Sequence, residues 1–497
     1  MPILFLPPTA GCGPGAQQKQ PETEARKFDG VSLRVACPDA VSAKIVRRFA
    51  PGWGHRVGAK VEVELYDAGA PARAGREARP PGGAHVWVLP AAELPRYAAA
   101  GVLAPLPDTF RKDRKVDWAG LLPLYRQQLL IWDRAPYALP LCGDAPLCFY
   151  RKDLFHDEKN RAAYRDRHGR DLQPPATWED FLRIAEFFHQ GRSASKGSLP
   201  PLPTDDRALD ALFYTVAAPI VRRAVREDER AGSRPSNEDL FAFHFDLTGA
   251  PHIATPGFVE ALRLLQAMQA YRPEKAAPEP WRAFRDRHAV LCLDDCRRLH
   301  EFQKKGSPVR DLVGVCALPG SGYYYTFAEG HKRSFPGERV NRVPYLGAGA
   351  LVLAVPRSGG QMDAAFALVA ELGGRSVSQQ VVLEPRWGGG IVRSAQVDRE
   401  HRDAFRLEGD SARELRSSLR QTFEPNIRNP LACLRLPDER HLVEALAQHL
   451  RSALEGKEKV EPSAALADVA GAWEKRIGPH KTDHLHAYRL SLGLPGN

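Results

Sequence analysis

Strand-like segments at two separated places in the chain constrain its fold more than any other feature of the sequence. Branched and apolar residues alternate, or run together, at 31–37, 60–66, 85–90, 284–293, 312–319 and 348–355. Such patterns are typical of β-strands. Helical patterns follow the early strands and dominate 206–230 and 256–270. The early alternation predicts an α/β domain with a largely parallel sheet, and the late return of strands predicts a chain that crosses between two discontinuous lobes.

Two helix starts are marked by capping residues. Asp39 precedes an apolar stretch and predicts a helix that runs through Phe49. Thr177 stands before a second amphipathic stretch, with Asp180 three residues later, which is the spacing of a capping box. Both starts fit the alternation of strands and helices.

Length and charge exclude several classes of protein. The 497 residues suffice for two large domains or about three smaller ones. The net charge of +10 is spread among interleaved acids and bases, as at 222–230, which is typical of solvated helix faces. We therefore expect no nucleic-acid partner. The apolar runs are shorter than the roughly 18 residues that cross a bilayer, which excludes a polytopic membrane protein.

The N-terminal segment contains a short apolar run that ends in Ala10, Gly11 and Cys12, followed by a polar stretch. This arrangement resembles a bacterial lipoprotein signal, with Cys12 as the lipid-attachment residue and residues 1–28 as signal and tether. The alternative is a cytosolic tail with an incidental cysteine. Of the seven other cysteines, Cys292 with Cys296 or Cys142 with Cys148 form a disulfide only in an oxidising compartment. Buried thiols are the simpler expectation.

Sequence motifs of the common enzyme classes are missing. The chain has no GxSxG, no HExxH, no kinase signature and no GxGxxG after its first strand. No Cys/His set has the spacing of a zinc site. We expect neither an enzyme nor a bound metal or cofactor. A glycosidase with two carboxylates stays open as an alternative, because residue types alone do not exclude it.

A series of short sequence blocks occurs in an order known from one family. The blocks lie at 85–89 with 101–106, 137–140 through 149–155, 175–181, 284–290, 313–320, 346–353 and 464–473. In this order they resemble extracellular solute-binding proteins of the sugar-binding type (family 1), the ligand-capture subunits of ABC importers. The resemblance covers about residues 31–475. It implies a type II periplasmic-binding-protein-like α/β fold with two lobes, a hinge and an interlobe cleft.

This resemblance implies a division of the chain and a role. Lobe 1 is expected at 29–142 plus 286–345, lobe 2 at 143–285 plus 346–480, and a C-terminal tail at 481–497. The expected role is an extracytoplasmic or periplasmic receptor, held at the membrane by its lipid anchor, that closes its lobes on a carbohydrate-like ligand and delivers it to ABC permease subunits. The alternatives are a carbohydrate-active enzyme, or a sensor or scaffold without a transport role, on the same fold.

Seven residues are the candidates for ligand contact under this resemblance: Asp144, Trp387, Gly388, Tyr345, Gly347, Asp295 and Trp132. Asp144 lies in a turn at the first expected crossover, and Gly347 lies in a turn at a later one. A carboxylate there can accept hydrogen bonds from sugar hydroxyls, but an Asp in a turn also caps its own backbone. Asp295 ends a strand, where α/β sheets place ligand groups, or it caps a helix.

The aromatic candidates each have a packing alternative. Trp387 precedes three glycines, which let a ligand approach the backbone closely, or it anchors the loop on the core. Tyr345 fits a cleft or a core position equally well. Trp132 is a possible stacking residue, although packing is the simpler role. Arg393 either pairs with an anionic substituent of a ligand or binds a group within its lobe.

Overall fold

The computed structural model describes residues 26–67, 80, 82–190, 197–227, 236–327, 329–337, 339–384, 387, 390–397, 407, 409–424, 427–456 and 460–495. Two expected site residues, Cys12 and Gly388, lie outside these ranges. Within the described part of the chain, no helix has the length and apolar character needed to cross a membrane.

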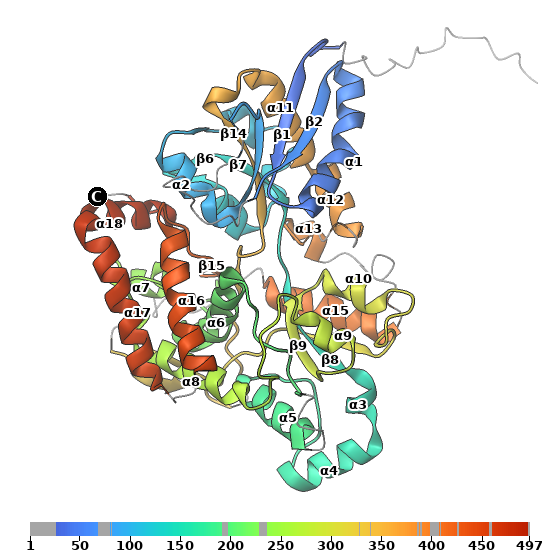
Figure 1. Cartoon of the computed structure of the whole chain (residues 1–497), viewed down its shortest axis with the longest axis vertical. Helices are drawn as coiled ribbons and strands as arrows, with labels where there is room; N and C mark the ends of the chain where they lie inside the picture. The colour runs from blue at the N-terminus through green and yellow to red at the C-terminus, as the bar shows by residue number, and fades with distance from the viewer. Residues whose placement is uncertain are drawn as a thin grey trace, which may run out of the picture.

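Lobe 1 is built on a six-stranded sheet with the order β2-β1-β3-β14-β4, in which β7 also pairs with β14 (Figure 1). Its strands are β1 (Ser32–Cys37), β2 (Lys60–Leu65), β3 (Val86–Pro90), β4 (Leu103–Ala104), β7 (Ala138–Cys142) and β14 (Leu351–Pro356), with a small ribbon of β5 (Ile131–Trp132) and β6 (Ala135–Pro136). β1 is parallel to β2 and β3, as expected, whereas β14 is antiparallel to β3, β4 and β7. β14 reverses the direction because the chain re-enters lobe 1 from lobe 2.

Helices cover both faces of this sheet. They are α1 (Ala40–Val57), α2 (Leu94–Ala99), α11 (Met362–Leu372), α12 (Arg375–Leu383) and α13 (Ser394–Val397), with short turns η1 (Ala91–Glu93), η2 (Asp108–Arg111), η3 (Trp118–Gly120), η4 (Tyr125–Leu129) and η5 (Arg357–Gly359). Asp39 caps α1 as predicted, since its Oδ1 accepts from the N–H of Ser42 at 2.7 Å. The helix continues past Phe49, because Trp53 and Val57 are buried in the core beneath it.

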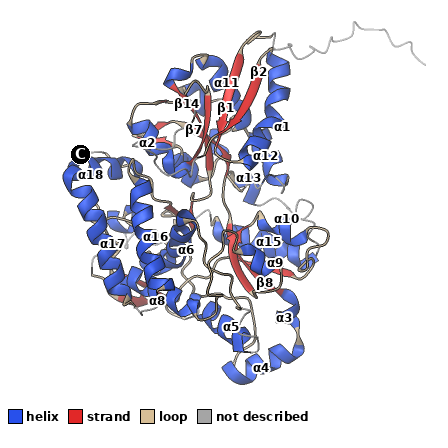
Figure 2. Ribbon diagram, in the orientation of Figure 1, coloured by secondary structure: helices blue, strands red, loops and turns tan. Residues whose placement is uncertain are grey.

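Lobe 2 combines a small antiparallel sheet with a larger helical layer (Figure 2). The sheet has the order β10-β8-β9. The strands of the lobe are β8 (Pro146–Arg151), β9 (Leu291–Asp295), β10 (Val313–Cys316), β11 (Tyr323–Tyr325), β12 (Lys332–Ser334), β13 (Tyr345–Leu346) and β15 (Leu431–Ala432). Its helices are α3 (Lys152–His156), α4 (Glu158–His168), α5 (Trp178–Gln190), α6 (Asp206–Val221), α7 (Asn237–Phe241), α8 (Pro256–Gln269), α9 (Trp281–Arg285), α10 (Arg298–Gln303), α15 (Gly409–Thr422), α16 (Glu439–Glu455), α17 (Pro462–Ile477), η7 (Gly478–His480) and α18 (Lys481–Ser491).

The capping box predicted at α5 is present. The N–H of Asp180 donates to Oγ1 of Thr177 at 3.2 Å, and Oδ2 of Asp180 accepts from the N–H of Thr177 at 3.3 Å. The segment 284–293 differs from its expected strand, because its first residues complete α9 and only the last part joins β9.

Strand pairing corrects the expected division into lobes. Residues 286–345 were expected in lobe 1, but β9 and β10 from this range pair with β8 of lobe 2. Residues 346–480 were expected in lobe 2, but β14 from this range pairs with β3 and β7 in the sheet of lobe 1. Pairing in the two sheets and the helices packed on them therefore place the described residues of 143–350 and 407–495 in lobe 2, and those of 26–142 and 351–397 in lobe 1.

The expected C-terminal tail is a packed helix. α18 buries Tyr488, whose hydroxyl donates to the carbonyl of Phe245 at 2.8 Å. Leu490 is also buried. The end of the described chain thus belongs to lobe 2.

Two apolar cores hold the molecule together. One core fills the space between the lobe 1 sheet and α1, α11 and α12. The other begins on the opposite face of that sheet and continues past Leu129, Tyr345 and Leu346 into lobe 2. The seven described cysteines are free thiols, six of them buried. The simpler expectation for the cysteines is therefore met among these residues.

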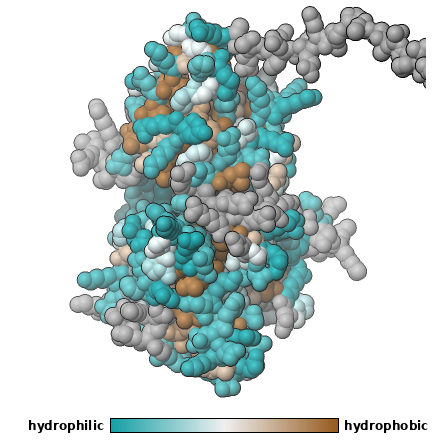
Figure 3. Space-filling view, turned by 90° about the vertical axis from the view of Figure 1, so that its right-hand side faces the viewer, coloured by the Kyte–Doolittle hydropathy of each residue, from teal (hydrophilic) through white to brown (hydrophobic). Residues whose placement is uncertain are grey.

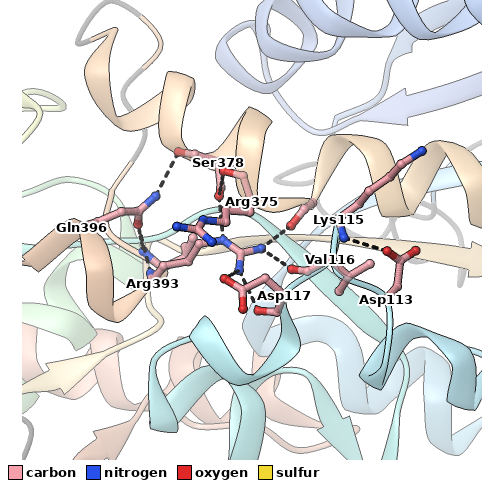
Figure 4. A network of polar contacts seen from close by, with 10 residues as sticks. Asp113, Lys115, Val116, Asp117, Arg375, Ser378, Arg393 and Gln396 are labelled. Atoms are coloured by element: carbon pink, nitrogen blue, oxygen red, sulfur yellow. Dashed lines mark hydrogen bonds and ion pairs between the residues drawn. The ribbon is translucent and has the colours of Figure 1, made fainter. Parts of the chain in front are cut away.

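Arg393 shows how lobe 1 holds a buried charge (Figure 4). Its Nε donates to Oγ of Ser378 at 2.7 Å, and its two terminal nitrogens donate to the carbonyls of Val116, Asp117 and Gly373 at 2.8–2.9 Å. Gln396 accepts from the N–H of Arg393 at 3.0 Å. Arg393 therefore binds groups within its own lobe and ties α12 to the loop before η3.

The outer surface offers little apolar area. Hydrophilic residues cover most of the face in Figure 3, and its hydrophobic residues form small separate groups. Among the described residues, the only exposed large hydrophobic side chains are Val41 and Leu65. This pattern agrees with the interleaved charges of the sequence.

Candidate functional site

A cavity of about 440 Å³ opens in lobe 2 beside two of the crossovers that join it to lobe 1. Apolar walls come from the proline-rich segment at 200–203 and from α6, and polar walls come from the end of β9 and the start of α10. Ligand cavities in proteins measure roughly 300–1,000 Å³ and combine apolar walls with a few polar groups. Its size and lining are therefore those of a site for a small molecule.

Asp144 fastens the crossovers to each other. Its carboxylate accepts from the N–H of Gly347 at 2.8 Å and from the N–H of Gly349 at 3.2 Å. Gly347 has a φ of 94°, which favours glycine because a Cβ is strained there. Burial, with the nearby charge of Asp295, raises the pKa of Asp144 to about 6. Asp144 thus holds residue 347 and residue 349 against the first crossover.

The end of β9 supplies two acid–arginine pairs. Asp295 accepts from the N–H of Ala145 at 2.7 Å and lies 3.1 Å from Nε of Arg297. Asp294 lies 3.1 Å from Nε of Arg298. The neighbouring charge of Asp295 holds the pKa of Arg297 above its usual range, and burial raises the pKa of Asp294. The polar wall of the cavity is thus a set of fixed charges already paired with one another.

Arg207 on α6 links the cavity wall to both lobes. Its guanidinium donates to Glu439 of lobe 2 at 2.9 and 3.1 Å and to Glu93 of lobe 1 at 2.9 Å. Both glutamates are buried. Burial raises the pKa of Glu439 to about 7 and raises the pKa of Glu93. Because the arginine donates to a carboxylate on each side, this contact favours the arrangement of the lobes seen here.

Arg272 is the least compensated charge on the wall. Among the described residues, its Nη1 donates to the carbonyl of Pro200 at 2.6 Å, and its Nε is buried without a partner. Burial lowers the pKa of Arg272 to about 10. A guanidinium with free N–H groups at a cavity wall can donate to hydroxyl or anionic oxygens of a ligand.

Trp281 contributes its indole ring to the lining of the cavity. The guanidinium carbon of Arg298 lies 4.8 Å from the ring centroid of Trp281, and those of Arg282 and Arg285 lie 5.2 Å away. The indole N–H is buried and has no acceptor among the described residues. Aromatic rings of this kind present an apolar face together with a polar edge.

The structure brings three of the expected contact residues together at this cavity. Asp144, Tyr345 and Asp295 line it, and Gly347 donates to Asp144 directly behind it. The hydroxyl of the buried Tyr345 accepts from the N–H of Leu434 at 3.3 Å. Trp132 is buried in β5, away from the lining residues, and Trp387 packs edge-on against Phe49 in lobe 1 with ring centroids 5.3 Å apart.

Sequence reasoning missed the arginines. Arg297 and Arg298 follow the strand end at Asp295 after one intervening residue, so their position near a candidate carboxylate was a usable signal. Arg207 and Arg272 carry no such local signal, because only the packing of lobe 2 brings them to the cavity. Groups of three or more His, Cys, Asp or Glu that could hold a metal ion do not occur in the described part of the chain.

Comparisons with known proteins identify the fold. No model of a known protein family matches the chain. The sugar-binding protein MalE from Xanthomonas citri is 17% identical, with a TM-score of 0.60, over 90% of this chain and 100% of that one. An ABC transporter solute-binding protein from Agrobacterium radiobacter in complex with ribitol is 19% identical, with a TM-score of 0.62, over 90% and 99%. The maltose-bound MalE3 of T. maritima is 15% identical, with a TM-score of 0.61, over 90% and 100%. The chain therefore has the type II periplasmic-binding-protein fold with two lobes, as the sequence predicts.

Proposed function

We propose that this chain is an extracytoplasmic solute-binding receptor that captures a carbohydrate-like ligand and delivers it to the permease of an ABC importer. The observation that carries the proposal is the cavity of about 440 Å³ at the crossovers of a two-lobed fold. Structures of the same fold are those of proteins that bind maltose or ribitol. The cavity lining supports this ligand class, because it combines apolar walls and the ring of Trp281 with carboxylate and guanidinium groups.

The structure supports a binding role for the carboxylates rather than acid–base chemistry. Asp144 and Asp295 both accept from backbone N–H groups, and Asp295 and Asp294 also pair with arginines. Such partners fix the carboxylates in position, which suits the recognition of hydroxyl groups.

Thermal unfolding with a panel of neutral sugars, oligosaccharides and polyols tests the proposal. A ligand present at 100 times its Kd stabilises the native state by roughly 2.7 kcal/mol, which raises the melting temperature by a few degrees. We expect at least one member of the panel to do so. Failure of every compound to raise the melting temperature contradicts the proposal.

A pair of matched variants locates the binding site. Ala211→Trp places a large side chain in the cavity, where Ala211 is part of the α6 wall. Ala163→Trp makes the same change at an exposed position of α4. We expect the ligand-induced shift to be lost only in Ala211→Trp. Equal shifts in both variants contradict the assignment of the cavity.

Small-angle scattering tests the closing of the lobes. The contact of Arg207 with Glu93 and Glu439 favours the present arrangement, and a ligand in the adjacent cavity adds to it. We expect the radius of gyration to fall when the ligand identified above is added. An unchanged radius contradicts binding by lobe closure.

Anchoring at the membrane is a separate part of the proposal, and it rests on the sequence around Cys12. Expression in a bacterium with a labelled fatty acid tests it. We expect label in the wild-type protein and none in Cys12→Ser. A wild-type protein without label contradicts the anchor.

A further inference from the structure

A second hollow on lobe 2 is lined mainly by arginines. This arginine groove has a volume of about 670 Å³ and lies between α15 and the loop that precedes β13. Its charged lining residues are Arg226, Arg342, Arg413, Arg416, Arg420 and Glu424. The formal charge of these side chains is five positive against one negative, or +4. No part of the carbohydrate cavity described above accounts for this concentration of charge.

The sequence of α15 places its arginines on one face. Arg413, Arg416 and Arg420 are spaced by three and four residues, whereas Leu415 and Leu419 are buried on the other face, which packs against β10. Like charges at this spacing destabilise a helix by roughly 0.2–0.5 kcal/mol per pair. Figure 1 shows α15 beside the sheet that contains β8 and β9. The arginines of α15 line the groove.

Glu424 and Asp410 each pair with one of the groove arginines. Glu424 is engaged by Arg226, whose Nε and Nη2 donate to its two oxygens at 2.8 and 3.1 Å. Arg413 pairs with Asp410 in the first turn of α15. Neither Arg342 nor Arg416 has a carboxylate within ion-pair distance among the described residues.

Arg342 and Arg416 also have unused donors. Nη2 of Arg342 donates to the carbonyl of Ala176 at 3.3 Å, but its Nε is buried without an acceptor in the described part of the structure. Nε of Arg416 is likewise buried without one. Burial lowers the pKa of Arg342. Two guanidinium groups from different elements thus face one groove with hydrogen-bonding capacity left over.

This arrangement suits a particular class of ligand. Guanidinium groups match the oxygens of phosphate and sulfate with paired hydrogen bonds, and several of them together neutralise a multivalent anion. A single carboxylate neutralises only one of the charges present. We propose that the arginine groove is a binding site for a small molecule that carries phosphate or sulfate groups, separate from the carbohydrate cavity.

The groove and the cavity have no lining residue in common. The hollow between them, which shares Thr215 and Leu318 with the cavity and Arg342 and Gln421 with the groove, has a volume of only about 20 Å³. That is room for about one water molecule. The two sites can therefore be tested separately, and a failure of one leaves the other intact.

Calorimetric titration with inorganic pyrophosphate, in 50 and 150 mM NaCl, tests the groove. We expect one binding event per chain in the wild-type protein, weakened but present at the higher salt concentration. In the double variant Arg342→Gln/Arg416→Gln we expect Kd to rise at least roughly tenfold, the effect of one lost charge-assisted hydrogen bond. A wild-type protein that does not bind pyrophosphate at 50 mM NaCl overturns the proposal.

A second double variant controls for net charge. Arg165→Gln/Arg167→Gln removes the same charge from α4, where both side chains are exposed and pair with Asp171 and Glu186. We expect its Kd to equal that of the wild type. A rise as large as that of the groove variant overturns the proposal, because it shows a general effect of charge.

Two further measurements keep the test decisive. If the groove double variant does not fold, Arg416→Lys replaces it, because lysine keeps the charge but lacks the paired N–H donors of the planar guanidinium. We expect this variant to bind pyrophosphate more weakly than the wild type. Binding as tight as that of the wild type contradicts recognition by the paired donors. Sedimentation with vesicles of phosphatidic acid separates a lipid headgroup from a free ligand. Pyrophosphate that competes fully with any vesicle binding supports the proposal, and vesicle binding that it does not displace overturns it.

Discussion

Arg393 in lobe 1 is buried and Arg272 in lobe 2 is half-buried, and the two guanidinium groups both lose solvation but differ in their hydrogen-bond partners. Burial lowers the pKa of each to about 10. Arg393 donates to three carbonyls and a hydroxyl, whereas Arg272 has the carbonyl of Pro200. The difference teaches that a buried charge indicates a ligand site only where its donors are unsatisfied. The first arginine belongs to the framework and the second to the cavity.

The largest expected effect is the loss of the framework arginine. Arg393→Ala leaves the carbonyls of Val116, Asp117 and Gly373 without their donors, so we expect the free energy of unfolding to fall by about 3–5 kcal/mol. Urea unfolding measures this change. Arg375→Ala, at an exposed position nearby, serves as the control, with a change within about 0.5 kcal/mol. A loss below about 1 kcal/mol in Arg393→Ala would show that the network is not structural.

The next largest effect on stability concerns Asp144, which lies at the first crossover between lobe 1 and lobe 2. Its native pKa of about 6 lies above the ordinary 3.8, so the native state binds more protons than the unfolded state between these values. Stability therefore falls as the pH rises through this window, by up to about 3 kcal/mol. We expect Asp144→Asn to remove this part of the pH dependence. Glu439, whose pKa is raised to about 7, also makes stability fall as the pH rises, and this part of the pH dependence remains in the variant.

Melting temperatures from pH 4 to pH 7.5 measure the effect. Asp166→Asn, an exposed change on α4, is the control and should keep the wild-type profile. An unchanged profile in Asp144→Asn would contradict the raised pKa.

A smaller change in stability is expected for the cavity arginine. Arg272→Gln removes one hydrogen bond together with the cost of burying the charge, so we expect a loss of no more than about 1 kcal/mol in urea unfolding. Binding of the carbohydrate-like ligand should weaken by roughly tenfold, since the free donors are lost. A stability loss as large as that of Arg393→Ala would remove the contrast between the two arginines.

The smallest expected effect is at Trp387. This side chain packs on Phe49 in lobe 1 and is not part of the cavity lining. We expect Trp387→Phe to leave the ligand-induced rise in melting temperature unchanged, within the error of the measurement. Loss of that rise would show that Trp387 contacts the ligand, as the sequence suggested, and would contradict the packing role.

The order of elements was predictable from the sequence, but their pairing was not. The alternation at 31–37 and 60–66 identified β1 and β2, and Asp39 marked the start of α1. These features depend on neighbouring residues. The assignment of β14 to the lobe 1 sheet depends on hydrogen bonds to β3 and β7, more than 200 residues earlier in the chain. The residues next to β14 in the sequence do not indicate which distant strands it pairs with.

The same division applies to the candidate site. Asp144 and Asp295 were identifiable because each stands at a turn or at the end of a strand. Arg272 reaches the cavity only because the segment that carries it packs against 200–203. Residues whose role depends on contacts between distant segments could not be found from one sequence.

The bonds of Asp144 have a mechanical consequence. One carboxylate holds the N–H groups of Gly347 and Gly349 while its own backbone belongs to the first crossover. These bonds tie the two connecting segments to each other, so we expect a swing of one lobe to turn both segments together as one pivot. At Gly347 a Cβ would come 2.7 Å from Cδ2 of Leu129, so the pivot also has no room for a side chain.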